Sequence, residues 1–136
     1  MDINSVLSKE EIPEINTLSP LTLAFLGDSV YEMFMRTKIL ASGNRPANEL
    51  HKLAVGYVKA KAQSNAAHKI LDMLTDDELA IYKRGRNTNI HTVPKNADMA
   101  DYRHSTALEA LIGYLYLKGE KERLIQILNV AFDSLS

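Results

Sequence analysis

The sequence contains no cysteine in its 136 residues. Disulfide bonds and thiolate metal sites are therefore excluded, and any metal ion must be held by oxygen ligands or by histidine. There is also no apolar run near the roughly 20 residues that cross a bilayer. The N-terminal stretch MDINSVLSKEEIPEI is too polar and acidic for a signal peptide. We therefore expect a cytoplasmic protein that forms one globular domain.

The chain also lacks an excess of positive or negative charge, since its formal net charge is −1. The charges are nevertheless unevenly distributed along the chain. Residues 1–35 carry six acidic side chains and one basic one, whereas residues 45–95 carry nine Lys or Arg and five acids. The densest basic cluster, at Lys83, Arg84 and Arg86, can produce a local positive patch. On charge distribution alone, a solvated helix face is the simpler interpretation.

The alternating pattern of β-strands is also absent, and the sequence predicts an all-α domain over residues 1–136 with a core at about 18–135. Helical stretches are expected at 20–40, 47–74, 77–86, 101–118 and 121–135. Ser19 and Thr75 read as N-caps, the latter in a capping box with Glu78. Gly56 is expected to divide the second stretch, and Gly119 to end the fourth. Residues 86–98 lack periodicity, so we expect a long loop of the kind that is often functional.

Two acidic residues lie within otherwise apolar helical stretches. Asp28 is in LTLAFLGDSVYEMF and Glu109 is in STALEALIGYLYL, each close to a glycine, Gly27 or Gly113. An ionised carboxylate on a buried face is costly unless it is paired or holds a metal ion. The pattern predicts two closely packed helices that bring these carboxylates together on buried faces. The alternative for Asp28 is a buried carboxylate bonded to a helix cap or an arginine.

The same segments carry a family resemblance. LAFLGDSVYE resembles the signature helix of the ribonuclease III family, and STALEALIGYLYL resembles its second acidic helix. The segments YKRGRN and YRHSTALEA, and a chain with no room for a double-stranded-RNA-binding domain, resemble the Mini-ribonuclease III group. The resemblance covers about residues 18–135. It implies a homodimeric helical bundle that hydrolyses phosphodiester bonds in double-stranded RNA, leaves 5′-phosphates, and matures both ends of the 23S ribosomal RNA precursor.

The resemblance also implies a magnesium site, with Mn²⁺ as a substitute. Asp28 and Glu109 match the family's catalytic, metal-binding carboxylates, while Ala24 and Thr106 stand where full-length members have two more. The number of bound ions stays open. Three further residues are candidates for contacting these carboxylates without binding the metal themselves: Glu32, His104 and Thr106. Asp98 and Asp101 either cap the following helix or reach the site through water, and His51 and His68 are expected at the helix surface or an interface.

Recognition of RNA by shape requires cations and amides spaced along a surface. One group of such side chains lies at a helix end and the following loop: Lys83, Arg84, Arg86, Asn87, Asn89, His91 and Lys95. A second strip is expected at Lys59, Lys61, Gln63 and Ser64. The alternative for each lysine is a solvated charge.

Cleavage of both strands implies a two-fold dimer, for which Phe25, Tyr31, Phe34 and Met35 are candidate contacts. Ribosomal proteins are candidate partners, and neither a membrane nor DNA is expected. Two other functions stay open at this point. One is a non-catalytic RNA-binding or ribosome-associated module of the same fold. The other is a helical protein-interaction domain with buried acidic caps.

Overall fold

The computed structural model describes residues 12–89, 93 and 95–136. Its helical elements are η3 (Ile15–Thr17), α1 (Pro20–Leu40), α2 (Ala47–Val58), α3 (Ala60–Ile70), η4 (Leu71–Met73), α4 (Asp76–Asn87), α5 (Met99–Lys118) and α6 (Lys121–Leu135), where η marks a 3-10 turn. These residues contain no strand, which confirms the all-α prediction. None of their helices is long and apolar enough to span a membrane.

Local capping chemistry determines several helix ends as predicted. Ser19 caps α1, its hydroxyl accepting from the Thr22 amide at 3.2 Å, and Pro20 occupies the first turn. Thr75 and Glu78 form the predicted capping box at the start of α4. Gly119 ends α5 in the left-handed region, at φ 79°.

Two boundaries differ from the prediction. The break between α2 and α3 falls at Lys59, whose extended backbone (ψ 155°) ends one helix and begins the next. Gly56 lies inside α2 instead. The helix α5 begins before Asp101, because the Asp98 carboxylate accepts a hydrogen bond from the Asp101 amide at 3.0 Å.

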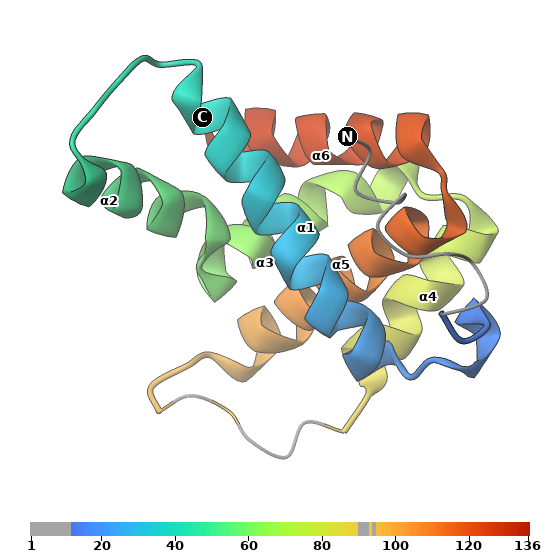
Figure 1. Cartoon of the computed structure of the whole chain (residues 1–136). Helices are drawn as coiled ribbons and strands as arrows, with labels where there is room; N and C mark the ends of the chain where they lie inside the picture. The colour runs from blue at the N-terminus through green and yellow to red at the C-terminus, as the bar shows by residue number, and fades with distance from the viewer. Residues whose placement is uncertain (1–11, 90–92, 94) are drawn as a thin grey trace.

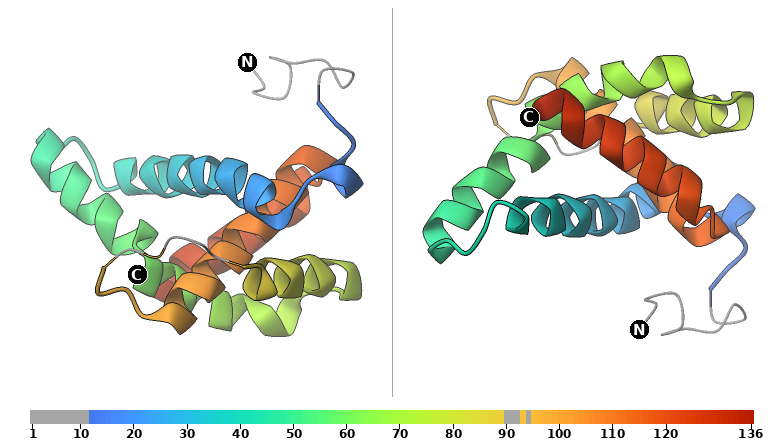
Figure 2. Two further views of the ribbon diagram at one scale, coloured as in Figure 1. Left: turned by 90° about the horizontal axis from the view of Figure 1, so that it is seen from below. Right: turned by 90° about the horizontal axis from the view of Figure 1, so that it is seen from above.

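The helix α5 is the centre of the fold. It contacts α1, α3, α4 and α6, and α1 crosses it on one side of the molecule (Figures 1 and 2). The core lies between these helices and includes the fully buried side chains Tyr31, Met35, Tyr82, Leu111 and Ile127. The connection after α1 leads to the periphery, where α2 begins before it runs back toward α3, and only Ala54 among the residues of α2 is buried.

The crossing of α1 and α5 is a direct backbone contact. A Cβ atom added to Gly27 would lie 1.7 Å from the carbonyl oxygen of Glu109, and one added to Gly113 would lie 2.1 Å from that of Leu23. Any larger residue at either glycine would overlap main-chain atoms of the other helix. Two glycines, 86 positions apart in the chain, thus set the separation of these helices.

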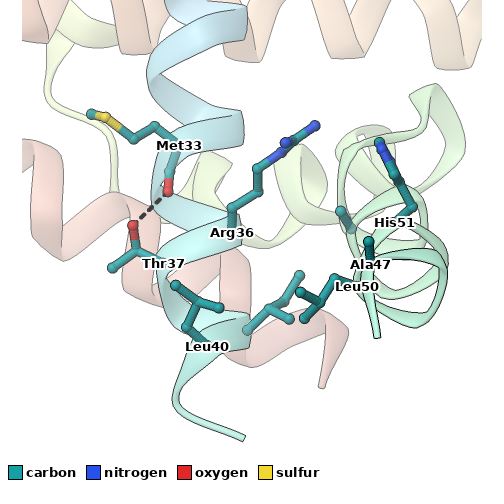
Figure 3. A pocket seen from close by; sticks show the side chains of 9 residues that line it. Met33, Arg36, Thr37, Leu40, Ala47, Leu50 and His51 are labelled. Carbon is teal, nitrogen blue, oxygen red and sulfur yellow. Dashed lines mark hydrogen bonds between the residues drawn. The ribbon is translucent and has the colours of Figure 1, made fainter. Parts of the chain in front are cut away.

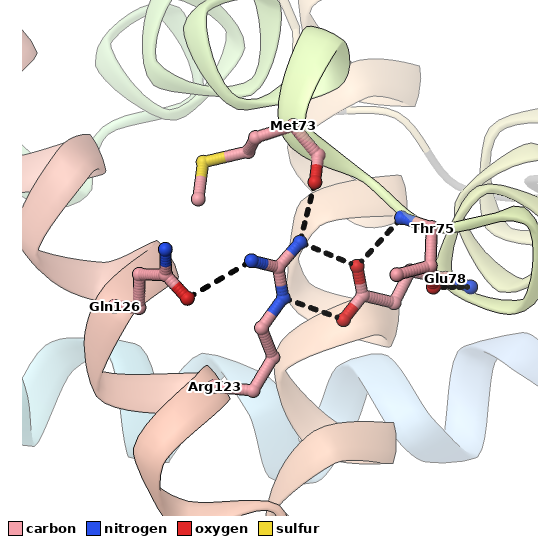
Figure 4. Close-up of polar contacts among 5 residues, drawn as sticks. All are labelled: Met73, Thr75, Glu78, Arg123 and Gln126. Atoms are coloured by element: carbon pink, nitrogen blue, oxygen red, sulfur yellow. Dashed lines mark hydrogen bonds and ion pairs between the residues drawn. The ribbon is translucent and has the colours of Figure 1, made fainter.

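A second connection ties α4 to α6 (Figure 4). The Arg123 guanidinium donates two hydrogen bonds of 2.8 Å to the buried Glu78 carboxylate, and it also donates to the Met73 carbonyl. Glu78 in turn accepts from the Thr75 amide at 2.9 Å. The bond to Arg123 is the main reason that the pKa of Glu78 is lowered. The capping box and the ion pair therefore share one carboxylate.

Replacing Gly27 by alanine should cost about 3 kcal/mol of unfolding free energy, because the methyl group cannot be accommodated without separating α1 from α5. Gly56→Ala is the matched control. No atom lies within 4 Å of the Cβ position at Gly56, so this change should stabilise the protein by about 0.5–1 kcal/mol. Urea unfolding followed by circular dichroism measures both. A Gly27→Ala protein as stable as the wild type would contradict the backbone contact.

Candidate active site

The contact between α1 and α5 brings the two predicted carboxylates together. Asp28 follows Gly27 directly, and the carbonyl oxygen that faces Gly27 belongs to Glu109. The side chains of Asp28 and Glu109 lie within hydrogen-bonding reach of each other. They come from helices whose main chains touch, so their separation is fixed by the fold.

The two carboxylates differ in burial, and the expectation of two buried faces is wrong for one of them. Asp28 is exposed, as are its helix neighbours Leu21 and Phe25, so it lies at the solvent-facing edge of the α1–α5 contact. Glu109 is partly buried. Burial, the hydrogen bond with Asp28 and the negative charge of Asp28 raise the pKa of Glu109 to about 9, while the Gln63 carboxamide opposes this shift. At neutral pH Glu109 therefore retains its proton unless a cation replaces it.

Two further polar groups adjoin Glu109, and the sequence did not indicate their roles. Tyr31, on α1, is fully buried, and its pKa is raised by burial and then by the charge of Glu109. Gln63, on α3, is 3% exposed. In the described part of the chain, the Tyr31 hydroxyl and the Gln63 Nε2 are the buried side-chain atoms without a hydrogen-bond partner. A glutamine among alanines at 60, 62, 66 and 67 was the available signal for Gln63.

The donor set fits a hard divalent cation. Mg²⁺ in proteins takes one or two carboxylates and completes its octahedron with water and substrate phosphate. Asp28 and Glu109 supply that minimum, and the described residues contain no group of three or more His, Asp or Glu side chains suited to a metal. Ala24 and Thr106, at which the resemblance implies further carboxylates in full-length members, are both buried. The number of protein ligands is therefore small.

The three residues predicted to support the ligating carboxylates form contacts with other residues. Glu32 forms an exposed ion pair of 2.8 Å with Arg36. The Thr106 hydroxyl donates to the Tyr102 carbonyl at 2.9 Å, and His104 Nδ1 lies 2.5 Å from the Tyr82 hydroxyl. None of these contacts involves Asp28 or Glu109, so support of the ligating carboxylates by these three residues stays a prediction.

The remaining candidates near α5 are mainly structural. Asp98 caps α5, and Asp101 pairs with Lys61 at 3.5 Å. His68, on the exposed surface of α3, packs against His104 with ring centroids 4.4 Å apart. Burial and the nearby charges of His68 and Arg86 lower the pKa of His104. The exposed His51 is on α2, as the helix-surface prediction requires.

The predicted basic cluster lies at the C-terminal end of α4. Lys83 and Arg84 are exposed, and Arg86 is partly buried. The backbone carbonyl of Arg86 accepts from Arg103 at 3.3 Å, which attaches this end of α4 to α5. Arg86 Nε donates to the Asn87 side chain at 3.2 Å. Three cations therefore surround one anchored helix end.

The other RNA-binding candidates differ in their exposure to solvent. Asn89 and Lys95 are exposed in the segment between α4 and α5, and His91 lies outside the described residues. Lys59 and Lys61 are exposed at the start of α3, but Gln63 and Ser64 are buried, so the strip predicted there is wrong for those two. They face the core because α3 packs on α5, which a helical pattern of small residues does not reveal.

Comparison with known proteins identifies the family of this chain. Residues 21–120 match the ribonuclease III domain. The chain is 48% identical to the Mini-ribonuclease 3 of Thermoanaerobacter sp. (strain X514), over 96% of this chain and 90% of that protein. It is also 48% identical to the Mini-ribonuclease 3 of Brevibacillus brevis, over 93% of this chain and 95% of that protein.

A solved structure agrees as well. A crystal structure of a Fusobacterium nucleatum protein matches 90% of this chain and 99% of its own, with a TM-score of 0.80 and 35% identity. Two acidic helices fixed by a glycine contact, in an all-helical domain, thus occur in a chain that matches this family over most of its length. The chain belongs to the ribonuclease III family and to its Mini-ribonuclease III group, and it is an endoribonuclease.

Proposed function

We propose that this endoribonuclease hydrolyses phosphodiester bonds of double-stranded RNA with Mg²⁺ held by Asp28 and Glu109, and that it matures both ends of the 23S ribosomal RNA precursor. The observation that carries the metal-dependent part is the fixed pairing of Asp28 with Glu109. The assignment of the precursor rests on similarity to the Mini-ribonuclease III group. A cytoplasmic location and ribosomal proteins as partners stay predictions of the sequence.

The chemistry requires a nucleophilic water and neutralisation of charge on the phosphate, and a bound divalent ion supplies both. Asp28 and Glu109 would hold the ion from two helices whose main chains are in direct contact. Glu109 would release its proton to solvent when the ion binds, so its full negative charge would be present only together with the ion. Asp28 lies on the open side of the site, where an RNA phosphate can approach. Rigid placement of both carboxylates keeps reorganisation small during the reaction.

The RNA duplex would be held by phosphate contacts from the end of α4. Lys83 and Arg84 extend into solvent, and Arg86 stands beside the anchored backbone. Asn89 and Lys95 extend this surface along the following segment. Contacts of this kind recognise the shape of a duplex and depend strongly on salt.

We further propose that two copies pair through the outer side of α1. Phe25 is 81% exposed, and Met33 (49%) and Leu40 (60%) are exposed on the same helix. Met33 and Leu40 also line an apolar hollow of about 490 Å³ between α1 and α2, which Figure 3 shows with Leu50 of α2. Among the predicted interface residues, Tyr31 and Met35 are wrong, because both are fully buried within the chain, and Phe34 is partly buried.

The position of Phe25 links pairing to the active site. Phe25 and Asp28 are three residues apart, on one side of α1. A partner that covers Phe25 therefore stands next to the carboxylates. Two sites related by the two-fold axis would then face the two strands of one duplex.

Asp28→Asn and Glu109→Gln should each lower the rate of cleavage of an RNA duplex by roughly 10³-fold or more, because each removes half of the protein's charge at the metal. Folding should be retained, since a protonated Glu109 and a glutamine are both neutral and hydrogen-bonding. Single-turnover cleavage in Mg²⁺, with circular dichroism as the folding check, measures this. Asp72→Asn, an exposed carboxylate in η4, is the matched control. Activity retained in Asp28→Asn would remove Asp28 from the mechanism.

Alanine at both Arg84 and Arg86 should weaken RNA binding and lower the slope of log affinity against log salt by about 1 for each phosphate that is no longer neutralised. Filter binding of a duplex at 50–200 mM salt gives the slope. Arg45→Ala with Lys52→Ala removes equal charge near α2, on the other side of the molecule from α4 (Figure 1). An unchanged slope in the Arg84 and Arg86 variant would exclude this surface from the RNA interface.

Phe25→Asp should convert a dimer to a monomer at micromolar concentration, because it places a charge in an apolar interface. Light scattering coupled to gel filtration reports the mass. Ile125→Asp, on α6, changes another exposed apolar residue, 50% exposed, and should leave the dimer intact. A wild-type protein that is monomeric under these conditions would refute the paired-site arrangement.

A further inference from the structure

Gln63 is buried in a place where nothing in the folded chain satisfies it. It lies in the first turn of α3, which packs against α5 (Figure 1). Its side chain is 3% exposed, and its Nε2 has no hydrogen-bond partner among the described residues. A buried amide without a partner is destabilising, and native chains retain few such groups. Its retention here calls for a partner that the described residues do not complete by themselves.

The surroundings of Gln63 indicate what that state is. Its neighbours on α3 include Ala62, Ala66 and Ala67, which offer no polar atom on their side chains. The polar group beside it is the Glu109 carboxyl, whose pKa the Gln63 carboxamide lowers. The Gln63 carboxamide thus lies close to the Glu109 carboxyl, although its Nε2 does not reach the geometry of a hydrogen bond.

A second buried polar group without a hydrogen-bond partner also lies near Glu109. The Tyr31 hydroxyl, from α1, is fully buried, lies close enough for the charge of Glu109 to affect it, and has no partner in the described part of the chain. Two unpartnered buried groups, from helices on either side of α5, thus adjoin one carboxylate. A coincidence of packing would not concentrate both at the proposed metal ligand.

We propose that Gln63 is a positioning residue, whose amide donates to the Glu109 carboxylate when that carboxylate holds a divalent cation. Hydrogen bonds of this kind orient a ligand oxygen toward its metal, and their loss typically costs 10–100-fold in metal affinity. With two carboxylates at the site, the orientation of each one has a large effect on binding. This inference rests on the proposed metal site at Asp28 and Glu109.

The test is Mn²⁺ binding, measured by electron paramagnetic resonance on the full chain with and without an RNA duplex made uncleavable by 2′-O-methylation. Gln63→Leu should weaken Mn²⁺ binding roughly 10–100-fold. Without Mn²⁺, its melting temperature should equal or exceed that of the wild type, because an unsatisfied donor has been removed. Asn65→Leu, an exposed amide on the same helix, is the matched control and should bind Mn²⁺ normally.

The outcomes separate the possible explanations. A lower melting temperature with unchanged Mn²⁺ affinity would make Gln63 a structural residue and overturn the inference, while the metal site stands. A wild-type protein that binds no Mn²⁺ in either condition would refute the metal site and this inference together. If Gln63→Leu does not fold, the wild-type protein gives the answer by NMR. Exchange of the Gln63 side-chain amide with solvent should slow on addition of Mg²⁺, and an unchanged exchange rate would overturn the proposal.

Discussion

The main-chain contact between α1 and α5 is the constraint on which the other features of the molecule depend. Gly27 and Gly113 allow the helices to approach so closely that neither position can carry a Cβ atom. This contact holds the core of α1 against α5, and it also aligns the edge where Asp28 and Glu109 meet. Stability and chemistry are therefore properties of the same few atoms. A change that loosens the crossing would separate the carboxylates at the same time that it destabilises the fold.

The site that results is electrostatically incomplete. An exposed carboxylate stands beside a partly buried one, whose pKa is raised because burial and a neighbouring negative charge both favour its neutral form. Tyr31 and Gln63 add unsatisfied polar groups to the same neighbourhood. The buried carboxylate of Glu78, by contrast, is satisfied by its hydrogen bonds to Arg123. Local rules are thus broken where function is expected and followed where only stability matters.

The features that the sequence predicted are those with a local chemical cause. Caps at Ser19 and Thr75 and the left-handed Gly119 mark helix ends through their own side chains or backbone freedom. The acidic pair was predictable because a charge in an apolar helical run next to a glycine has few explanations. Packing between distant helices decided the rest. A lysine such as Lys59 has no backbone preference that predicts a helix break. The burial of Gln63, Tyr31 and Met35 depends on which faces of α3 and α1 pack against the core.

The peripheral position of α2 has a consequence for motion. Only Ala54 of this helix is buried, no side-chain bond caps its N-terminus, and a hollow separates part of it from α1. Apart from Tyr57 and Val58 at its C-terminal end, which pack against the core, α2 buries little apolar surface, so the backbone amides of its first two turns should exchange with solvent long before those of α5. The molecule thus combines a tightly packed crossing of α1 and α5 with a peripheral helix, α2, that can open separately. Opening of α2 would leave the contact between α1 and α5, and with it the distance between the two carboxylates, in place.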